Sequence, residues 1–344
     1  MTRLPAEWEE QDGVLLAWPP TTGNYGPHFD VAAARETFAQ LAALITRYER
    51  VLLVANEPAD LPERLAAAGA DLACVRVVPL AFNDYWSRDF GPLTVRDGDT
   101  LRLLDFTFNG WGAKFTAELD NQVTRRLHAA GAFAAGVAHA PVDMVLEGGS
   151  LDSDGAGTLL TTRVCLLTET RNRGWPAARI EAALHAHFGV TRVLWLDHGA
   201  IRGDDTDSHV DMLARFAPDD TILHATCDRA DDWHAGPLGR MAAELSALRT
   251  AAGRPYRLLP LPIPRPLHDA DGRRLAASYA NFLVINGAVL VPTYRDPAAD
   301  AAALATLGAA FPGRAVHGVD VLPLIVENGS LHCVTMQLPR GVLA

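Results

Sequence analysis

TLLTTRVCLLTETRNRGWPAARIEAALHAHFGVTRVLWL, residues 158–196, is the stretch that decides the fold. Its first half holds two apolar runs, at 158–162 and 164–167, which predict two short strands. Residues 176–188 predict a helix, because a proline stands at the first turn and a glycine directly follows the last. The apolar run at 192–196 predicts another strand. This part of the chain is therefore expected to form two strands, a helix and a strand.

The same order of elements recurs along the chain. Units of this kind start near residues 13, 84, 147, 209 and 279. Even spacing is typical of repeat architectures, so one interpretation is five ββαβ units about a central axis, in a single domain over 1–344. The other is an ordinary α/β sheet, in which strands and helices alternate as well. The spacing alone leaves both open.

Composition argues against several classes of function. The 344 residues are 49% hydrophobic and carry a net charge of −11, so a sizeable core is available. No basic stripe stands out, which argues against nucleic acid or an anionic membrane as a partner. The first ten residues lack the apolar segment of a signal peptide, and no apolar run reaches about 18 residues. We therefore expect a cytoplasmic protein without a transmembrane helix.

Lysine and cysteine usage narrows the chemistry. Lys114 is the only lysine among 30 basic residues, so Schiff-base chemistry would rest on it alone. No Gly-Lys-Ser/Thr sequence occurs, which excludes a P-loop. The four cysteines are far apart and form no C-x-x-C pair, which excludes a zinc ribbon and a thioredoxin-type site. We expect them to be reduced thiols.

Four short clusters are unusually polar for the strands they touch. Each lies at a boundary between units, and in a ring of repeats such boundaries converge on the axis. A cysteine, a histidine and several carboxylates around one cavity would suit guanidinium, because two carboxylates can accept its N–H groups in paired hydrogen bonds. The clusters are NDYWSRDFGP at 83–92, EGGS at 147–150, DDTDSHVD at 204–211 and ENGSLHC at 327–333.

The cluster at 204–211 contains a histidine and an aspartate two positions apart. In the strand that we expect over 209–216, His209 and Asp211 would share one face and could address one substrate group. The alternative is a solvated acidic loop, which accounts for the aspartates before the histidine. It accounts less well for His209 and Asp211, because an apolar run follows them directly.

Four other residues each have a functional and a structural interpretation. Cys333 follows a Gly-Ser turn and a histidine, where a thiol can become nucleophilic; a core cysteine is the alternative. Trp86 could stack on a planar cation or fill the core. Asp89 could simply pair with Arg88, and Glu147 could accept a backbone amide in a turn.

Several blocks, in the same order, resemble the agmatine and bacterial peptidylarginine deiminase family of guanidino-group-modifying enzymes. The resemblance covers nearly the whole chain. It implies an α/β fold, a five-bladed pseudo-symmetric α/β propeller of ββαβ units. The blocks are PAEWE at 5–9, GVLLAWP at 13–19, NDYWSRDFGP at 83–92, FNGWG at 108–112, EGGS at 147–150, DDTDSHVD at 204–211, SYANF at 278–282 and LHC at 331–333.

The resemblance also implies roles for individual residues. Cys333 matches the family's nucleophile and His209 its general acid and base. Asp89 and Asp211 match the carboxylates that hold the guanidinium. The residues implied to line the substrate site are Trp86, Glu147 and Asp205.

The implied reaction is the hydrolysis of a guanidino substrate through a covalent thiouronium intermediate on Cys333. For agmatine, the first expectation, the products are N-carbamoylputrescine and ammonia, a step of putrescine and polyamine biosynthesis. No metal or organic cofactor is needed, because the covalent step splits the displacement in two. A homodimer is expected from the family. The chain departs from the family pattern at two places. It has ENGS at 327–330, where many members have a glycine run, and Ser208, where glycine is common. Both departures concern which substrate tail is recognised and leave the residues of the reaction unchanged.

Three alternatives remain open at this point. Peptidylarginine deimination, which yields citrulline, uses the same chemistry and would need an open groove, whereas agmatine would suit a closed chamber with a carboxylate at its far end. A catalytically inactive binding protein would hold guanidines without releasing ammonia. A metal-dependent hydrolase would use, as its ligands, Asp205, Asp207, His209 and Asp211. If carboxylates meet in an empty site, we expect at least one raised pKa among them.

Overall fold

The computed structural model describes residues 2–344, and their strands form five small sheets. Two sheets have four strands: β1 (Thr2–Arg3), β5 (Leu93–Asp97), β6 (Thr100–Thr107) and β7 (Ala138–Val145); and β17 (Thr335–Pro339), β2 (Gln11–Ala17), β3 (Arg50–Ala55) and β4 (Val75–Pro79). Three sheets have three strands: β10 (Arg192–Leu196), β9 (Thr158–Thr162) and β8 (Leu151–Ser153); β11 (Ala214–Ala217), β12 (Thr221–Thr226) and β13 (Arg257–Pro262); and β14 (Leu283–Ile285), β15 (Ala288–Thr293) and β16 (Ala315–Asp320).

The three-stranded sheets each have the order of two strands, a helix and a strand, and the four-stranded sheets contain it with one further strand, β1 or β4. In one of them β8 runs antiparallel to β9, and the chain returns through α7 to β10, which lies parallel to β9. In another, β17 pairs antiparallel with β2, so the last strand of the chain completes the sheet of the first ones. The predicted mixed α/β class is confirmed. The helices are α1 (Val31–Ile45), α2 (Leu61–Ala67), α3 (Ser87–Phe90), α4 (Gly110–Ala113), α5 (Val123–Ala129), α6 (Arg163–Leu166), α7 (Ala177–Phe188), α8 (Ala235–Ala247), α9 (Pro297–Ala310) and α10 (Leu322–Ile325).

The predicted strand at 164–167 is wrong. The short helix α6 begins there, because the Thr162 side chain caps it by accepting a hydrogen bond from the backbone N–H of Cys165. The antiparallel partner of β9 comes from before it, in β8. An apolar run of four residues after a strand can start a buried helical turn as easily as a second strand.

The predicted strand over 209–216 is also wrong in its first half. Residues Val210–Met212 form a 3-10 turn, and only Ala214–Ala217 are extended. The carboxylate of Asp204 accepts the backbone N–H of Ser208, and Ser208 has a φ of +66°. A left-handed backbone ends any extended pairing, and it explains why glycine suits this position.

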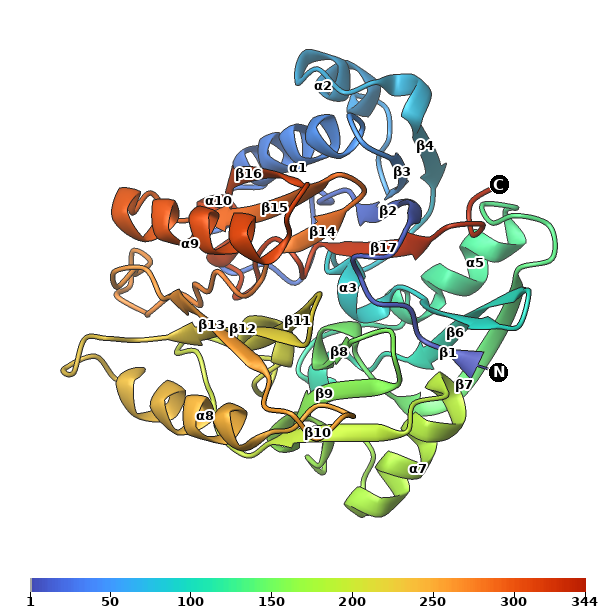
Figure 1. Ribbon diagram of the computed structural model, residues 1–344. Helices are drawn as coiled ribbons and strands as arrows, with labels where there is room; N and C mark the ends of the chain where they lie inside the picture. The colour runs from blue at the N-terminus through green and yellow to red at the C-terminus, as the bar shows by residue number, and fades with distance from the viewer. Residues whose placement is uncertain (1) are drawn as a thin grey trace.

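The helices lie on the outside of the sheets. Figure 1 shows α1, α5, α7, α8 and α9 around the rim, with the strands directed inward. Every residue of β9 is buried, as expected for a strand that is covered on both faces. Within residues 2–344, no helix combines the length and the apolar character that a membrane crossing requires.

Candidate active site

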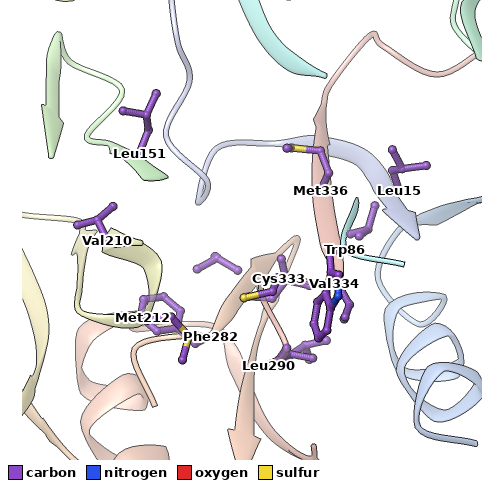
Figure 2. Close-up of a cluster of buried hydrophobic side chains, with 14 of the residues drawn as sticks. Leu15, Trp86, Leu151, Val210, Met212, Phe282, Leu290, Cys333, Val334 and Met336 are labelled. Carbon is purple, nitrogen blue, oxygen red and sulfur yellow. The ribbon is translucent and has the colours of Figure 1, made fainter. Parts of the chain in front are cut away.

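Cys333 lies in the turn that leads into β17, and only 4% of its surface is exposed. Figure 2 shows it at the start of the segment that carries Val334 and Met336. Its sulfur nevertheless contacts polar groups: the Asn281 Nδ2 atom is 3.3 Å away and the Asp211 Oδ2 atom 3.8 Å away. Cys333 therefore belongs to the buried hydrophobic cluster of Figure 2 and also contacts polar groups where it lines a pocket, so both of its interpretations apply.

Gly149 marks the point where three predicted site residues meet. A Cβ atom on it would lie 2.6 Å from His209 Nδ1, 2.9 Å from Asp89 Oδ1 and 3.0 Å from Asp211 Oδ2. Such distances are too short for a side chain, so glycine is required by the close approach of these groups. The clusters at 83–92, 147–150 and 204–211 thus converge, as the sequence predicts.

The two aspartates differ in their partners. Asp89 accepts hydrogen bonds from Trp111 Nε1 and from the backbone N–H of Gly149, both at 2.9 Å. Burial and the nearby charge of Asp211 raise the pKa of Asp89 well above its usual value. Asp211 accepts from His332 Nδ1 at 2.8 Å, and although burial opposes it, this partner lowers the pKa of Asp211. The expected raised pKa among the carboxyl groups of the site is that of Asp89.

His209 is completely buried, and within residues 2–344 neither ring nitrogen has a hydrogen-bond partner. Burial lowers the pKa of His209 to about 3, although Asp211 acts to raise it. The Nδ1 atom is 3.7 Å from Asp89 Oδ1. A neutral imidazole with free nitrogens can both accept and return a proton.

Glu147 lies beside His209 rather than on a pocket wall. Its Oε1 atom accepts from Arg171 Nε at 3.0 Å, and Arg171 also pairs with Asp207. Burial outweighs Arg171 and raises the pKa of Glu147. Among residues 2–344, one group of side chains is close enough to hold a metal ion. It consists of the Glu147 carboxylate, the Cys165 sulfur and a His209 nitrogen, which lie within 4.8 Å of one another. Arg171 already neutralises the carboxylate there.

The four residues considered as ligands of a metal-dependent hydrolase do not converge on one point. Asp205 Oδ2 accepts from Asn328 Nδ2 at 2.8 Å, and Asp207 pairs with Lys114 and with an arginine. Asp211 instead accepts from His332. The carboxylates are thus engaged in separate contacts, and this geometry does not support the metal alternative.

A narrow pocket leads to Cys333. The volume of this pocket is about 30 Å³. None of the described residues that line it is basic. Trp86 is only 5% exposed and forms part of the wall, so its functional and structural interpretations both apply. The lining residues are Asn24, Asp84, Trp86, Asp89, Trp111, Phe115, Asp205, Thr206, Glu327, Asn328, Gly329 and Cys333. A larger hollow, of about 850 Å³, contains none of the predicted site residues.

Comparisons with known proteins match this chain over nearly its whole length. The model of the Porphyromonas-type peptidyl-arginine deiminase family matches residues 3–339. The chain belongs to this family. The agmatine deiminase of Stutzerimonas stutzeri is 34% identical over 98% of this chain and 95% of its own.

Solved structures agree with this assignment to the deiminase family. A C. jejuni agmatine deiminase variant with substrate bound has 37% identity and a TM-score of 0.91, covering 99% of this chain and 97% of that one. A Porphyromonas gingivalis protein, provisionally named an arginine deiminase, has 42% identity and a TM-score of 0.93, covering 100% of both chains.

Several residues of this deiminase site have no candidate role in the sequence analysis. Asn281 and Trp111 stand inside the blocks at 278–282 and 108–112 that carry the family resemblance. Those blocks are the sequence feature that could have identified both as site residues. Arg171, which pairs with Glu147, stands in no matched block and gives no signal of its own.

The thiol of Cys333 gives a pH prediction for the ligand-free deiminase. Burial, Asp211 and Asp89 raise its pKa well above the usual value, so the group is a neutral thiol at pH 7. We expect its alkylation by iodoacetamide, followed by peptide mass spectrometry, to be slow at pH 7 and to keep rising beyond pH 9. A rate that levels off below pH 8 would contradict this. The denatured chain, in which the ordinary thiol pKa is about 8.5, is the control.

Proposed function

We propose that the chain hydrolyses agmatine to N-carbamoylputrescine and ammonia. One observation carries the choice of substrate: the pocket that reaches Cys333 is lined by four carboxyl groups and, among the described residues, by no basic one. Agmatine has a cation at each end, so both ends would meet acidic groups. Free arginine would bring an α-carboxylate among those carboxyls, and a blocked arginyl peptide would bring no second cation to meet them.

Asp89 and Asp211 would hold the guanidinium in this proposal. The Oδ1 atom of Asp211 is buried and lacks a hydrogen-bond partner within residues 2–344, so it is free to accept a guanidinium N–H. A cation between the two carboxyls would also favour the ionised form of Asp89. The same two carboxylates would then both bind the guanidinium and polarise its carbon for attack.

The chemistry would proceed in two displacements. The Cys333 thiol gives its proton to the neutral His209, and the sulfur forms a bond to the guanidinium carbon. His209 returns the proton to the departing nitrogen, the C–N bond breaks, and ammonia leaves a thiouronium on the sulfur. Water then loses one proton to His209 and attacks the same carbon. The C–S bond breaks, the second proton of the water passes to the sulfur, and the ureido product leaves. His209 gives its proton to solvent, where the released ammonia takes it up as ammonium.

The arrangement of the five sheets fits this use of the fold. We infer a single catalytic domain over residues 1–344, a five-bladed pseudo-symmetric α/β propeller, with the site near its axis. Its support is the ββαβ order contained in every sheet and the pairing of β17 with β2, which joins the two ends of the chain. Residues from the clusters at the unit boundaries would then face one centre.

Steady-state assays test the substrate assignment. We expect kcat/KM for ammonia release to be at least about 10²-fold higher with agmatine than with free arginine or a blocked arginyl peptide, since mispaired buried charges cost several kcal/mol. Equal or better turnover of the peptide would replace agmatine by peptidylarginine. Guanidine binding without ammonia release from any of the three would indicate an inactive binding protein.

Asp205 tests how the far end of agmatine is recognised. It lines the pocket, and burial raises its pKa to about 6. We expect Asp205→Asn to raise KM for agmatine about tenfold and to leave kcat within threefold, because one charge-assisted contact is lost. An alkylguanidine without the terminal amine should be unaffected. The exposed Asp219→Asn is the control for the change in net charge.

A further inference from the structure

The imidazole of His332 lies between two carboxylates. Its Nε2 atom is 2.7 Å from Glu7 Oε2, and its Nδ1 atom is 2.8 Å from Asp211 Oδ2. The ring is 2% exposed. A neutral imidazole has one N–H, so it can donate to both carboxylates only in its protonated form. The ring orientation of His332 is therefore set from both sides.

Glu7 is held as an anion at the other end of this arrangement. Its Oε2 atom also accepts from Arg215 Nη2 at 2.8 Å, and its Oε1 atom accepts the backbone N–H of Val284 at 2.7 Å. Although burial acts to raise it, the pKa of Glu7 is far below its usual value, because Arg215, His332 and Arg88 surround it. Glu7 is therefore a fixed hydrogen-bond acceptor for the His332 ring.

The contact with His332 decides which oxygen of Asp211 faces the substrate. Oδ2 is taken by the imidazole, while the buried Oδ1 has no hydrogen-bond partner in the described part of the chain. Glu7, His332 and Asp211 all lie behind the pocket wall, but Asp211 Oδ2 is 3.8 Å from the sulfur of Cys333, which lines the pocket. Any influence on the guanidinium must therefore pass through Asp211.

Asp89 provides a comparison within the same site. It is also buried, with 5% exposed against 0% for Asp211, but its hydrogen-bond donors are the neutral N–H groups of Trp111 and Gly149. Its pKa is raised, whereas that of Asp211 is lowered. The charged donor is what distinguishes the two carboxyls.

We propose that His332 is a positioning residue, which keeps Asp211 ionised with one oxygen reserved for the guanidinium, and that Glu7 fixes the orientation of the His332 ring. This rests on the proposed function and adds the device that prepares the empty site. One carboxylate is charged before substrate arrives, and the other becomes charged when the cation binds. The N-terminal segment therefore contributes to the site from 325 positions away in the chain.

The pH dependence of kcat/KM in His332→Gln tests this role. Glutamine keeps a donor for one carboxylate but carries no charge. We expect the acid limb of the profile to move up by about one to three pH units, with activity regained as the pH rises. Glu7→Gln should shift the limb in the same direction by less. The titratable and charged groups around Asp211, all retained in His332→Gln, are Glu7, Arg88, Asp89, His209, Arg215 and Cys333.

The outcomes separate this inference from the proposed function. If the wild type turns over agmatine but His332→Gln loses activity equally at every pH, His332 is only structural and the inference fails. If the wild type releases no ammonia from agmatine, the proposed function fails, and the profile is measured on the arginyl peptide. His139→Gln, which breaks a similar histidine–carboxylate pair with Asp105 in β6, is the control and should leave the limb in place.

Discussion

Cys333→Ala is expected to lower kcat for ammonia release from agmatine by roughly 10⁴-fold or more. Without the sulfur no covalent intermediate can form, and the remaining carboxylates can only bind the guanidinium. The change removes one atom from a nearly buried side chain whose sulfur contacts Asn281 and Asp211. The fold should therefore persist, and thermal unfolding should differ by a few degrees at most. Ammonia release and the unfolding midpoint are the two measurements.

The control for this substitution is Cys227→Ala. Cys227 is half-buried after β12 and lies outside the pocket, so its loss should leave turnover within about threefold of the wild type. A chelator provides a second arm. If the Cys333→Ala variant still releases ammonia and a chelator abolishes that release, the thiol mechanism is wrong and a metal-dependent hydrolase is supported.

The order of elements could be predicted because it is encoded locally. The helix expected at 176–188 is found at Ala177–Phe188, and the glycine after it has a φ of +66°. Proline and glycine mark such ends through their own backbone preferences, which need no tertiary contact. The helix at Arg163–Leu166 was missed since its cap, Thr162, also belongs to the preceding strand.

The meeting of distant residues could be predicted from the repeat and from the family resemblance, but not from any local pattern. His209, Asp211 and Asp89 were expected together because each stands at a unit boundary, and all three surround Gly149. The reason given for pairing the first two was nevertheless wrong, since Val210–Met212 is a 3-10 turn and not a strand. A tight turn can bring residues two apart to one side without β periodicity.

The supporting contacts could not be predicted from periodicity. Glu7 reaches His332 across 325 positions, and Arg171 reaches Glu147 across 24. A glutamate near a chain end or an arginine in a loop is most often solvated, so no local signal marks either as buried. Only the tertiary structure shows which charges the site needs to have neutralised.

His209→Gln is expected to lower kcat by about 10³-fold and to leave the thiouronium on Cys333. General acid–base catalysis contributes about 10²–10⁴-fold, and His209 serves both displacements. The quench is made at alkaline pH, where the bound guanidinium favours ionisation of the Cys333 thiol to solvent, so the first displacement can proceed without His209, whereas the attack of water still lacks its base. Mass spectrometry after an agmatine quench should therefore find Cys333 heavier by agmatine less ammonia. The variant keeps the size of the ring but has no nitrogen that titrates near neutral pH.

The adduct distinguishes a catalytic role of His209 from a structural one. A site deformed by the substitution would lose binding and form no adduct, whereas a site that lacks only its base would bind agmatine, form the adduct and stall. His224→Gln is the matched control, because His224 in β12 is also buried with a pKa lowered by burial, yet lies outside the pocket. Unchanged turnover in His209→Gln would mean that another group moves the proton, and the assignment of His209 would have to be abandoned.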